Sequence, residues 1–140
     1  MLAAFPLLVL PVALYNLLML TLGGGFTGAG AGGRLSTPLV NLHMVSRAVW
    51  PVSLSDILLT GSLLILFAEL LKSAGSRRIA ILNQFLSGLL FVVCLVEFLL
   101  FPAFATSTFF LISLMVLLDV AAGFIVTLVA SRREAGFRDG

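Results

Sequence analysis

Charged residues are scarce in this chain, and their scarcity excludes several functions at once. Among its 140 residues there are eight Lys or Arg and six Asp or Glu, whereas 61% of the residues are hydrophobic. A soluble domain of this size has too little interior to bury so much apolar surface, so we expect a single membrane domain over residues 1–140. The basic residues form no stripe with interleaved aromatic side chains, which excludes a nucleic-acid-binding surface.

The residues that carry chemistry are few as well. The only cysteine, Cys94, lies in an apolar run, which excludes a disulfide framework, a CxxC redox pair and a cysteine zinc site. The only histidine, His43, excludes bis-histidine haem ligation, and no cluster of His and carboxylates is spaced to hold a catalytic metal. No serine has an obvious neighbouring base. We therefore expect no enzyme activity, no cofactor and no metal.

Long apolar runs are what the chain does have. A membrane-spanning helix needs about 20 apolar residues, and the linkers between the last three runs are short enough for tight helical hairpins. The sequence therefore predicts an all-α fold of four transmembrane helices in two antiparallel hairpins. The four predicted spans are residues 2–22, 54–71, 79–101 and 106–130.

Proline and glycine punctuate the first part of the chain. Pro11 lies well inside the first predicted span, where a missing backbone N–H should bend the helix. Residues 23–36 are rich in glycine, which predicts a flexible loop on the outer side. An alternative is a close helix-packing ridge, because Gly24, Gly28 and Gly32 have GxxxG spacing.

Residues 38–50 are flanked by prolines and predict a short interfacial helix. On such a helix an apolar stripe would lie on lipid or on the top of the bundle, with Trp50 at headgroup depth. The opposite face carries His43 and Arg47. These two residues either form a polar mouth over the bundle or belong to a solvated face that anchors the loop.

One carboxylate, Asp119, lies near the middle of the last predicted span, about 19 Å from its outer end. A charge at that depth costs roughly 2.5 to 3.5 kcal/mol, so the residue must be paired, hydrated or neutral. Its possible partners are Ser87, Asn16 and Ser62. Glu97, about four residues inside the boundary of the third span, is a second intramembrane acid.

Two other acids have simpler explanations. Asp56 lies in the first turn of the second span, where a carboxylate complements the helix dipole. Glu69 lies three residues before Lys72, as in an ordinary ion pair at the membrane edge. Because Asp56 and Glu97 are both expected near the outer surface, they could join His43, Arg47 and Trp50 in a cluster at the outer mouth.

The basic residues predict the orientation of the spans. Six lie on the side of both termini and two, Arg34 and Arg47, lie on the other; the six are Lys72, Arg77, Arg78, Arg132, Arg133 and Arg138. Positively charged loops stay in the cytoplasm, so we expect both termini there, in the inner (plasma) membrane. The polar tail, residues 131–140, is predicted to be a disordered cytoplasmic segment.

Two functions remain after these exclusions. The favoured one is a small non-catalytic integral subunit or accessory protein, which packs in the lipid bilayer against a larger membrane complex or against copies of itself. Asp119 would then be a buried polar group that fixes helix packing. The alternative is a proton- or cation-coupled transporter or channel centred on Asp119.

Overall fold

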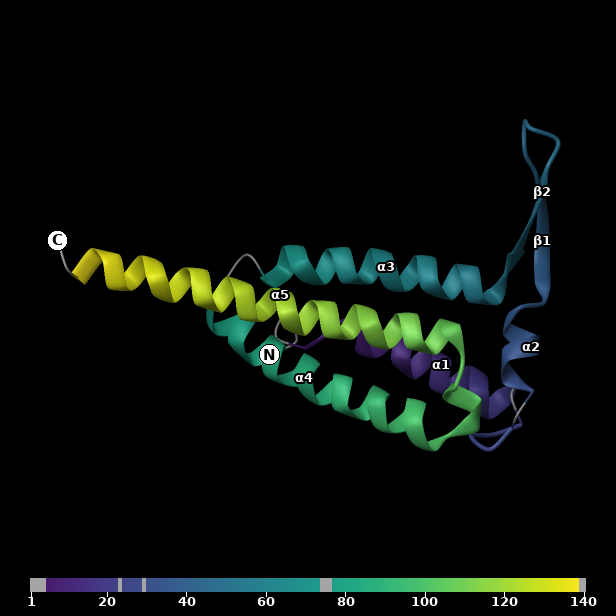
Figure 1. Cartoon of the computed structure of the whole chain (residues 1–140), viewed down its shortest axis with the longest axis horizontal. Coiled ribbons are helices and arrows are strands. Elements are labelled where there is room, and N and C mark those ends of the chain that lie inside the picture. The colour runs from purple at the N-terminus through teal and green to yellow at the C-terminus, as the bar shows by residue number, and fades with distance from the viewer. Residues whose placement is uncertain (1–4, 23, 29, 74–76, 139–140) are drawn as a thin grey trace.

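The computed structural model describes residues 5–22, 24–28, 30–73 and 77–138. In these residues it contains five α-helices, one 3-10 helix and a two-stranded sheet. The elements in chain order are α1 (Val9–Thr21), α2 (Ala31–Leu35), β1 (Pro38–His43), β2 (Val49–Ser53), α3 (Leu54–Ser73), α4 (Arg77–Leu100), η2 (Pro102–Phe104) and α5 (Ser107–Arg138). The long helices run side by side and the strands project from one end of them (Figure 1). We call this end the hairpin end, and the opposite end, where α5 finishes, the tail end.

Three helices are long and apolar enough to cross a membrane, and they indicate a membrane protein. They are Leu54–Lys72 within α3, Ile81–Leu100 within α4 and Ser107–Val129 within α5.

The fourth predicted span, 2–22, contains the shorter helix α1, whose 13 residues extend about 20 Å. Residues 1–4 of that span lie outside the described part of the chain. Pro11 falls in the first turn of α1, where a missing N–H costs nothing, so the predicted mid-helix kink is wrong.

Helix α5 is the centre of the bundle. It packs along both α3 and α4, whereas α3 and α4 contact each other much less. Figure 1 shows α5 between them, so α3 and α4 do not form the tight two-helix hairpin that their short linker predicts. Small buried residues on α5, among them Ser113 and Gly123, allow neighbouring helices to approach closely.

Aromatic rings form the core at the hairpin end. Phe104 of η2 is fully buried and lies 5.5 Å from the Tyr15 ring and 4.8 Å from the Phe109 ring, centroid to centroid. The Tyr15 hydroxyl contacts the carbonyl of Ala103 at 3.2 Å and the hydroxyl of Thr106 at 2.6 Å. A buried tyrosine needs a hydrogen-bond partner for its hydroxyl. Here the partners lie in the turn between α4 and α5, so the contacts attach α1 to that turn.

Residues 38–50 lie in a β-hairpin, so the predicted interfacial helix is wrong. β1 and β2 pair antiparallel, with Val40 opposite Val52 and Leu42 opposite Trp50. Arg47, in the turn, has a left-handed backbone with φ of 65°.

The physical reason for this difference is local. A helix confined between Pro38 and Pro51 would be too short to be stable without burial. Valine side chains also lose rotamer freedom in a helix but fit a strand well. Pairing two strands therefore satisfies the backbone of this segment better than a short helix does.

Two further segments differ from their predictions. The glycine-rich region, predicted as a loop over 23–36, contains the short helix α2, although residues 23 and 29 lie outside the described part. The tail, predicted to be disordered over 131–140, continues α5 as far as Arg138. Each further residue can join an existing helix without a new nucleation step. The tail also has no proline before Arg138 that would end the helix.

Candidate functional site

Asp119 lies in the interior of the bundle, bonded to a neighbouring helix. Its side chain is 3% exposed, and its Oδ2 accepts a 2.6 Å hydrogen bond from the hydroxyl of Ser87, which is fully buried on α4. Asp119 is twelve residues into α5, or about 18 Å along the helix from Ser107. This hydrogen bond thus joins α4 to α5 about midway along the candidate span Ser107–Val129 of α5.

Glu69 on α3 is a second fully buried carboxylate, and it is the residue whose importance the sequence did not reveal. Its Oε2 accepts a 2.6 Å hydrogen bond from the backbone N–H of Leu7. Its Oε1 lies 2.9 Å from Lys72 Nζ, and this contact is an ion pair without the geometry of a directed hydrogen bond. Lys72 Nζ also donates to the carbonyl of Phe5 at 2.7 Å. The Glu69–Lys72 pair therefore holds the segment before α1 against the end of α3.

We group the buried polar side chains of the three long helices, together with the partly exposed Lys72 that pairs with Glu69, as the interior polar cluster: Glu69, Lys72, Asn83, Ser87 and Asp119. Asn83 lies one turn before Ser87 on α4, and its buried carbonyl oxygen has no hydrogen-bond partner among the described residues. Three long helices thus supply two carboxylates, one ammonium, one amide and one hydroxyl to the same interior.

Ser62, a possible partner of Asp119 in the sequence, does not reach it. The Ser62 hydroxyl is buried but donates to the carbonyl of Leu58 on its own helix, at 2.7 Å. Such a bond satisfies a serine inside a membrane helix without any contact to another helix.

Asn16 and Glu97 form a separate polar pair nearer the hairpin end. The Asn16 amide donates to Glu97 Oε2 at 3.3 Å and to the carbonyl of Val12 at 3.1 Å. This contact links α1 to α4, since Glu97 lies one turn before the end of α4. Asn16 therefore pairs with Glu97 rather than with Asp119.

The residues predicted for an outer mouth do not converge. His43 and Trp50 lie in the strands and Arg47 in the turn, and all three are exposed. Asp56 instead caps α3: its Oδ2 accepts hydrogen bonds from the backbone N–H and the hydroxyl of Ser53, at 2.8 and 2.7 Å. Among the described residues there is also no group of three His, Cys, Asp or Glu that could hold a metal ion.

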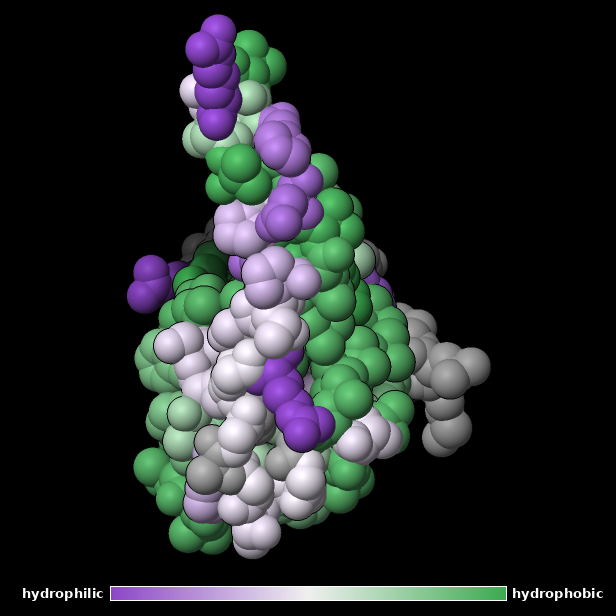
Figure 2. Space-filling model, turned by 90° about the vertical axis from the view of Figure 1, so that its right-hand side faces the viewer, coloured by the Kyte–Doolittle hydropathy of each residue, from purple (hydrophilic) through white to green (hydrophobic). Residues whose placement is uncertain are grey.

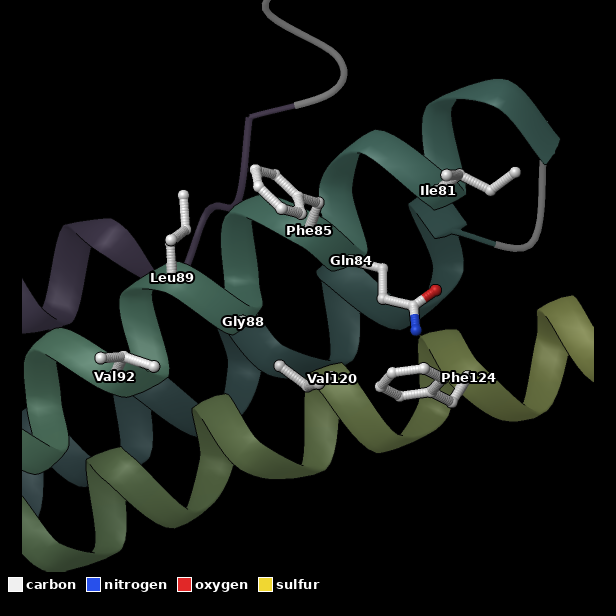
Figure 3. Close-up of a pocket in the computed structure, with 8 residues that line it drawn as sticks. All are labelled: Ile81, Gln84, Phe85, Gly88, Leu89, Val92, Val120 and Phe124. Carbon is white, nitrogen blue, oxygen red and sulfur yellow. The ribbon is translucent and has the colours of Figure 1, made fainter.

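Two apolar grooves run along the membrane-spanning part. One, of about 390 Å³, lies between α4 and α5 and is lined by Gly88, Val120 and Phe124 among others (Figure 3). The second, of about 450 Å³, lies between α1 and α3 and has Gly61 in its lining, with Leu14 opposite.

The glycines in these grooves differ from the glycine inside the bundle. A Cβ added at Gly61 or at Gly88 would have no heavy atom within 4 Å apart from its chain neighbours and the nearby backbone of its own helix. A Cβ added at Gly123 would lie 3.1 Å from Gln84 Cγ, so Gly123 serves the packing of α5 against α4. The packing of this chain therefore explains Gly123 but leaves Gly61 and Gly88 unexplained.

Comparison with known proteins adds no further constraint. No protein-family model, curated protein or solved structure matches this chain. The geometry of the interior polar cluster and of the two grooves is thus the basis for a functional proposal.

Proposed function

We propose that this chain is a small non-catalytic integral membrane subunit that packs against a larger membrane complex or against copies of itself. The observation that supports it is the pair of grooves whose glycines, Gly61 and Gly88, have no internal packing role. Glycine in a helix costs roughly 1 kcal/mol relative to alanine. In membranes that cost is offset where the missing side chain lets a second helix approach closely.

Contact with lipid explains the apolar residues on the rest of the surface, but it does not explain why glycine occupies positions 61 and 88. Leucine, valine and phenylalanine side chains cover the lipid-facing sides of the long helices, as a bilayer requires. An acyl chain packs equally well against leucine, so it gives no reason for glycine. A neighbouring helix does, because van der Waals packing drives helix association in lipid.

The interior polar cluster fits the same proposal as a packing device. Ser87 and Asp119 join α4 to α5, while Glu69 and Lys72 attach the segment before α1 to α3. With these bonds satisfied inside the chain, the outer faces are left apolar for lipid and for a partner. The excess of Lys and Arg at the tail end supports placing both termini in the cytoplasm and the hairpin outside.

Enlarging the groove glycines is expected to separate association from folding. Gly61→Leu and Gly88→Leu should be at least as stable in detergent as the unchanged chain, because the added side chains meet open space and leucine favours a helix more than glycine does. Chemical crosslinking in native membranes should nevertheless yield about tenfold fewer adducts. This corresponds to a loss of ~1.4 kcal/mol in association free energy.

Two controls make this experiment decisive. Thr60→Leu enlarges an exposed residue that lines neither groove, and it should leave the crosslinks unchanged. Gly123→Leu should destabilise the chain itself, because it clashes with Gln84. Unchanged crosslinks in both groove variants would contradict the proposal.

A proton- or cation-coupled transporter is the second candidate, and the charge balance of the interior polar cluster favours it. Two carboxyl groups, Glu69 and Asp119, are buried, and among the described residues only Glu69 has a cation, Lys72, as an ion-pair partner. Asn83 adds a buried carbonyl oxygen without a partner among the described residues. A bound proton or cation would neutralise the remaining negative charge of such a site.

Flux measurements distinguish the two candidates. For a subunit, we expect proteoliposomes of the purified chain to show no proton flux above that of empty vesicles. Asp119→Asn should then cost less than about 1 kcal/mol of stability, because the amide still accepts the Ser87 hydroxyl. Flux that disappears in Asp119→Asn would instead establish the transporter.

A further inference from the structure

The connection of the β1–β2 hairpin to a candidate membrane span determines where the hairpin lies relative to the membrane. Ser53 ends β2 and Leu54 begins α3, whose candidate span starts at the same residue. The strands run crosswise to the long helices, away from the bundle (Figure 1). A strand of five residues extends about 16 Å. Because it leaves the span sideways, its whole length stays near the membrane surface of the hairpin end.

The two faces of the hairpin differ in polarity. Paired residues share a face, so the pairs Val40–Val52 and Leu42–Trp50 form one apolar face. Asn41 and His43 lie on the other face with their partners Pro51 and Val49, because successive side chains alternate, so this face is mixed and carries the polar side chains of the strands.

Figure 2 views the molecule from the hairpin end, and both hydrophilic and hydrophobic side chains lie on the hairpin surface toward the viewer. Asn41 and His43 are the strongly hydrophilic residues of the strands. The face that bears Asn41 and His43 therefore suits contact with water better than the face of Val40, Leu42 and Trp50 does.

We propose that the hairpin lies flat on the lipid surface at the hairpin end, with its apolar face against the acyl chains. Val40, Leu42 and Trp50 are about half exposed in the chain alone, so their apolar surface is free for this contact. Arg47, in the turn, is exposed and supplies a cation for lipid phosphate groups.

Backbone hydrogen bonding limits how deep the hairpin goes. A two-stranded sheet has unpaired N–H and C=O groups along both outer edges. These groups cannot enter hydrocarbon, so the strands lie at headgroup depth and only their side chains reach the acyl region. Tryptophan favours this boundary, because its ring is apolar and its N–H is polar.

Trp50 is the only tryptophan of the chain, so its fluorescence reports the position of the hairpin directly. The full chain would be placed in nanodiscs of phosphatidylcholine, with and without phosphatidylglycerol. We expect blue-shifted emission, several-fold stronger quenching by lipids brominated near the headgroup than by lipids brominated near the chain end, and weak quenching by iodide.

Matched variants on the two faces test the orientation. Val40→Glu places a charge on the apolar face and should shift the emission to the red and remove most of the lipid quenching. Asn41→Glu places the same charge on the polar face and should change neither.

Three results would overturn the proposal. One is water-like emission of Trp50 in nanodiscs with strong iodide quenching. Another is an equal response of the two variants. The third is a blue shift seen only in native membranes, which would mean that a protein covers this face instead of lipid.

Discussion

Replacing Phe104 by alanine is expected to destabilise the folded chain by about 3 to 5 kcal/mol, the usual cost of removing a buried phenylalanine ring. Phe104 is fully buried and its ring contacts four others, with centroid distances from 4.8 to 6.1 Å. Those rings come from α1, the glycine-rich segment, the link between α4 and η2, and the start of α5; they are Tyr15, Phe26, Phe101 and Phe109. The cavity would therefore loosen four parts of the chain together.

Unfolding in detergent micelles, followed by circular dichroism, measures this loss. Phe85→Ala removes the same ring from an exposed position on α4 and should change the free energy of unfolding by less than about 0.5 kcal/mol. Equal effects of the two substitutions would show that the aromatic cluster is not the core of the hairpin end.

Replacing Glu69 by leucine is expected to cost about 2 kcal/mol, because it removes the buried partner of an ion pair and the acceptor of a backbone N–H. The Leu7 N–H would lose its acceptor and the Lys72 ammonium would lose its counterion. We expect the segment before α1 to detach from α3, which faster amide hydrogen exchange at Leu7 would reveal.

Glu69→Gln is the matched variant for this residue. The amide oxygen still accepts the Leu7 N–H but carries no charge for Lys72, so an intermediate loss of stability is expected. If leucine were tolerated as well as glutamine, the Glu69–Lys72 pair would not hold the N-terminal segment.

Several features of the fold follow from composition and hydropathy. The bounds of α3 and α4 differ from the predicted spans 54–71 and 79–101 by at most two residues at either end. This agreement is expected, because the length of an apolar run and the charges that flank it are set by the bilayer. The similar depth of Asp119 and Ser87 could also be counted along the helices, and the structure joins the two side chains.

Other features depend on tertiary packing that one-dimensional patterns do not contain. Glu69 and Lys72 have the spacing of a surface ion pair, and only the fold shows that Leu7 covers the carboxylate. The hairpin was missed because its apolar residues also fit a helical stripe, and the pairing of Leu42 with Trp50 is not local in sequence. The central place of α5 depends on close approach at small residues such as Gly123, which a hydropathy profile does not register.

Native mass spectrometry of the chain, released gently from its own membrane with its neighbours attached, tests the proposed subunit role most directly. We expect a complex of fixed stoichiometry, either with a larger membrane protein or with further copies of this chain. We also expect Gly61→Leu and Gly88→Leu to shift the population to the free chain, with Thr60→Leu unchanged. A free monomer carrying only lipid, seen equally in all four forms, would contradict the subunit role.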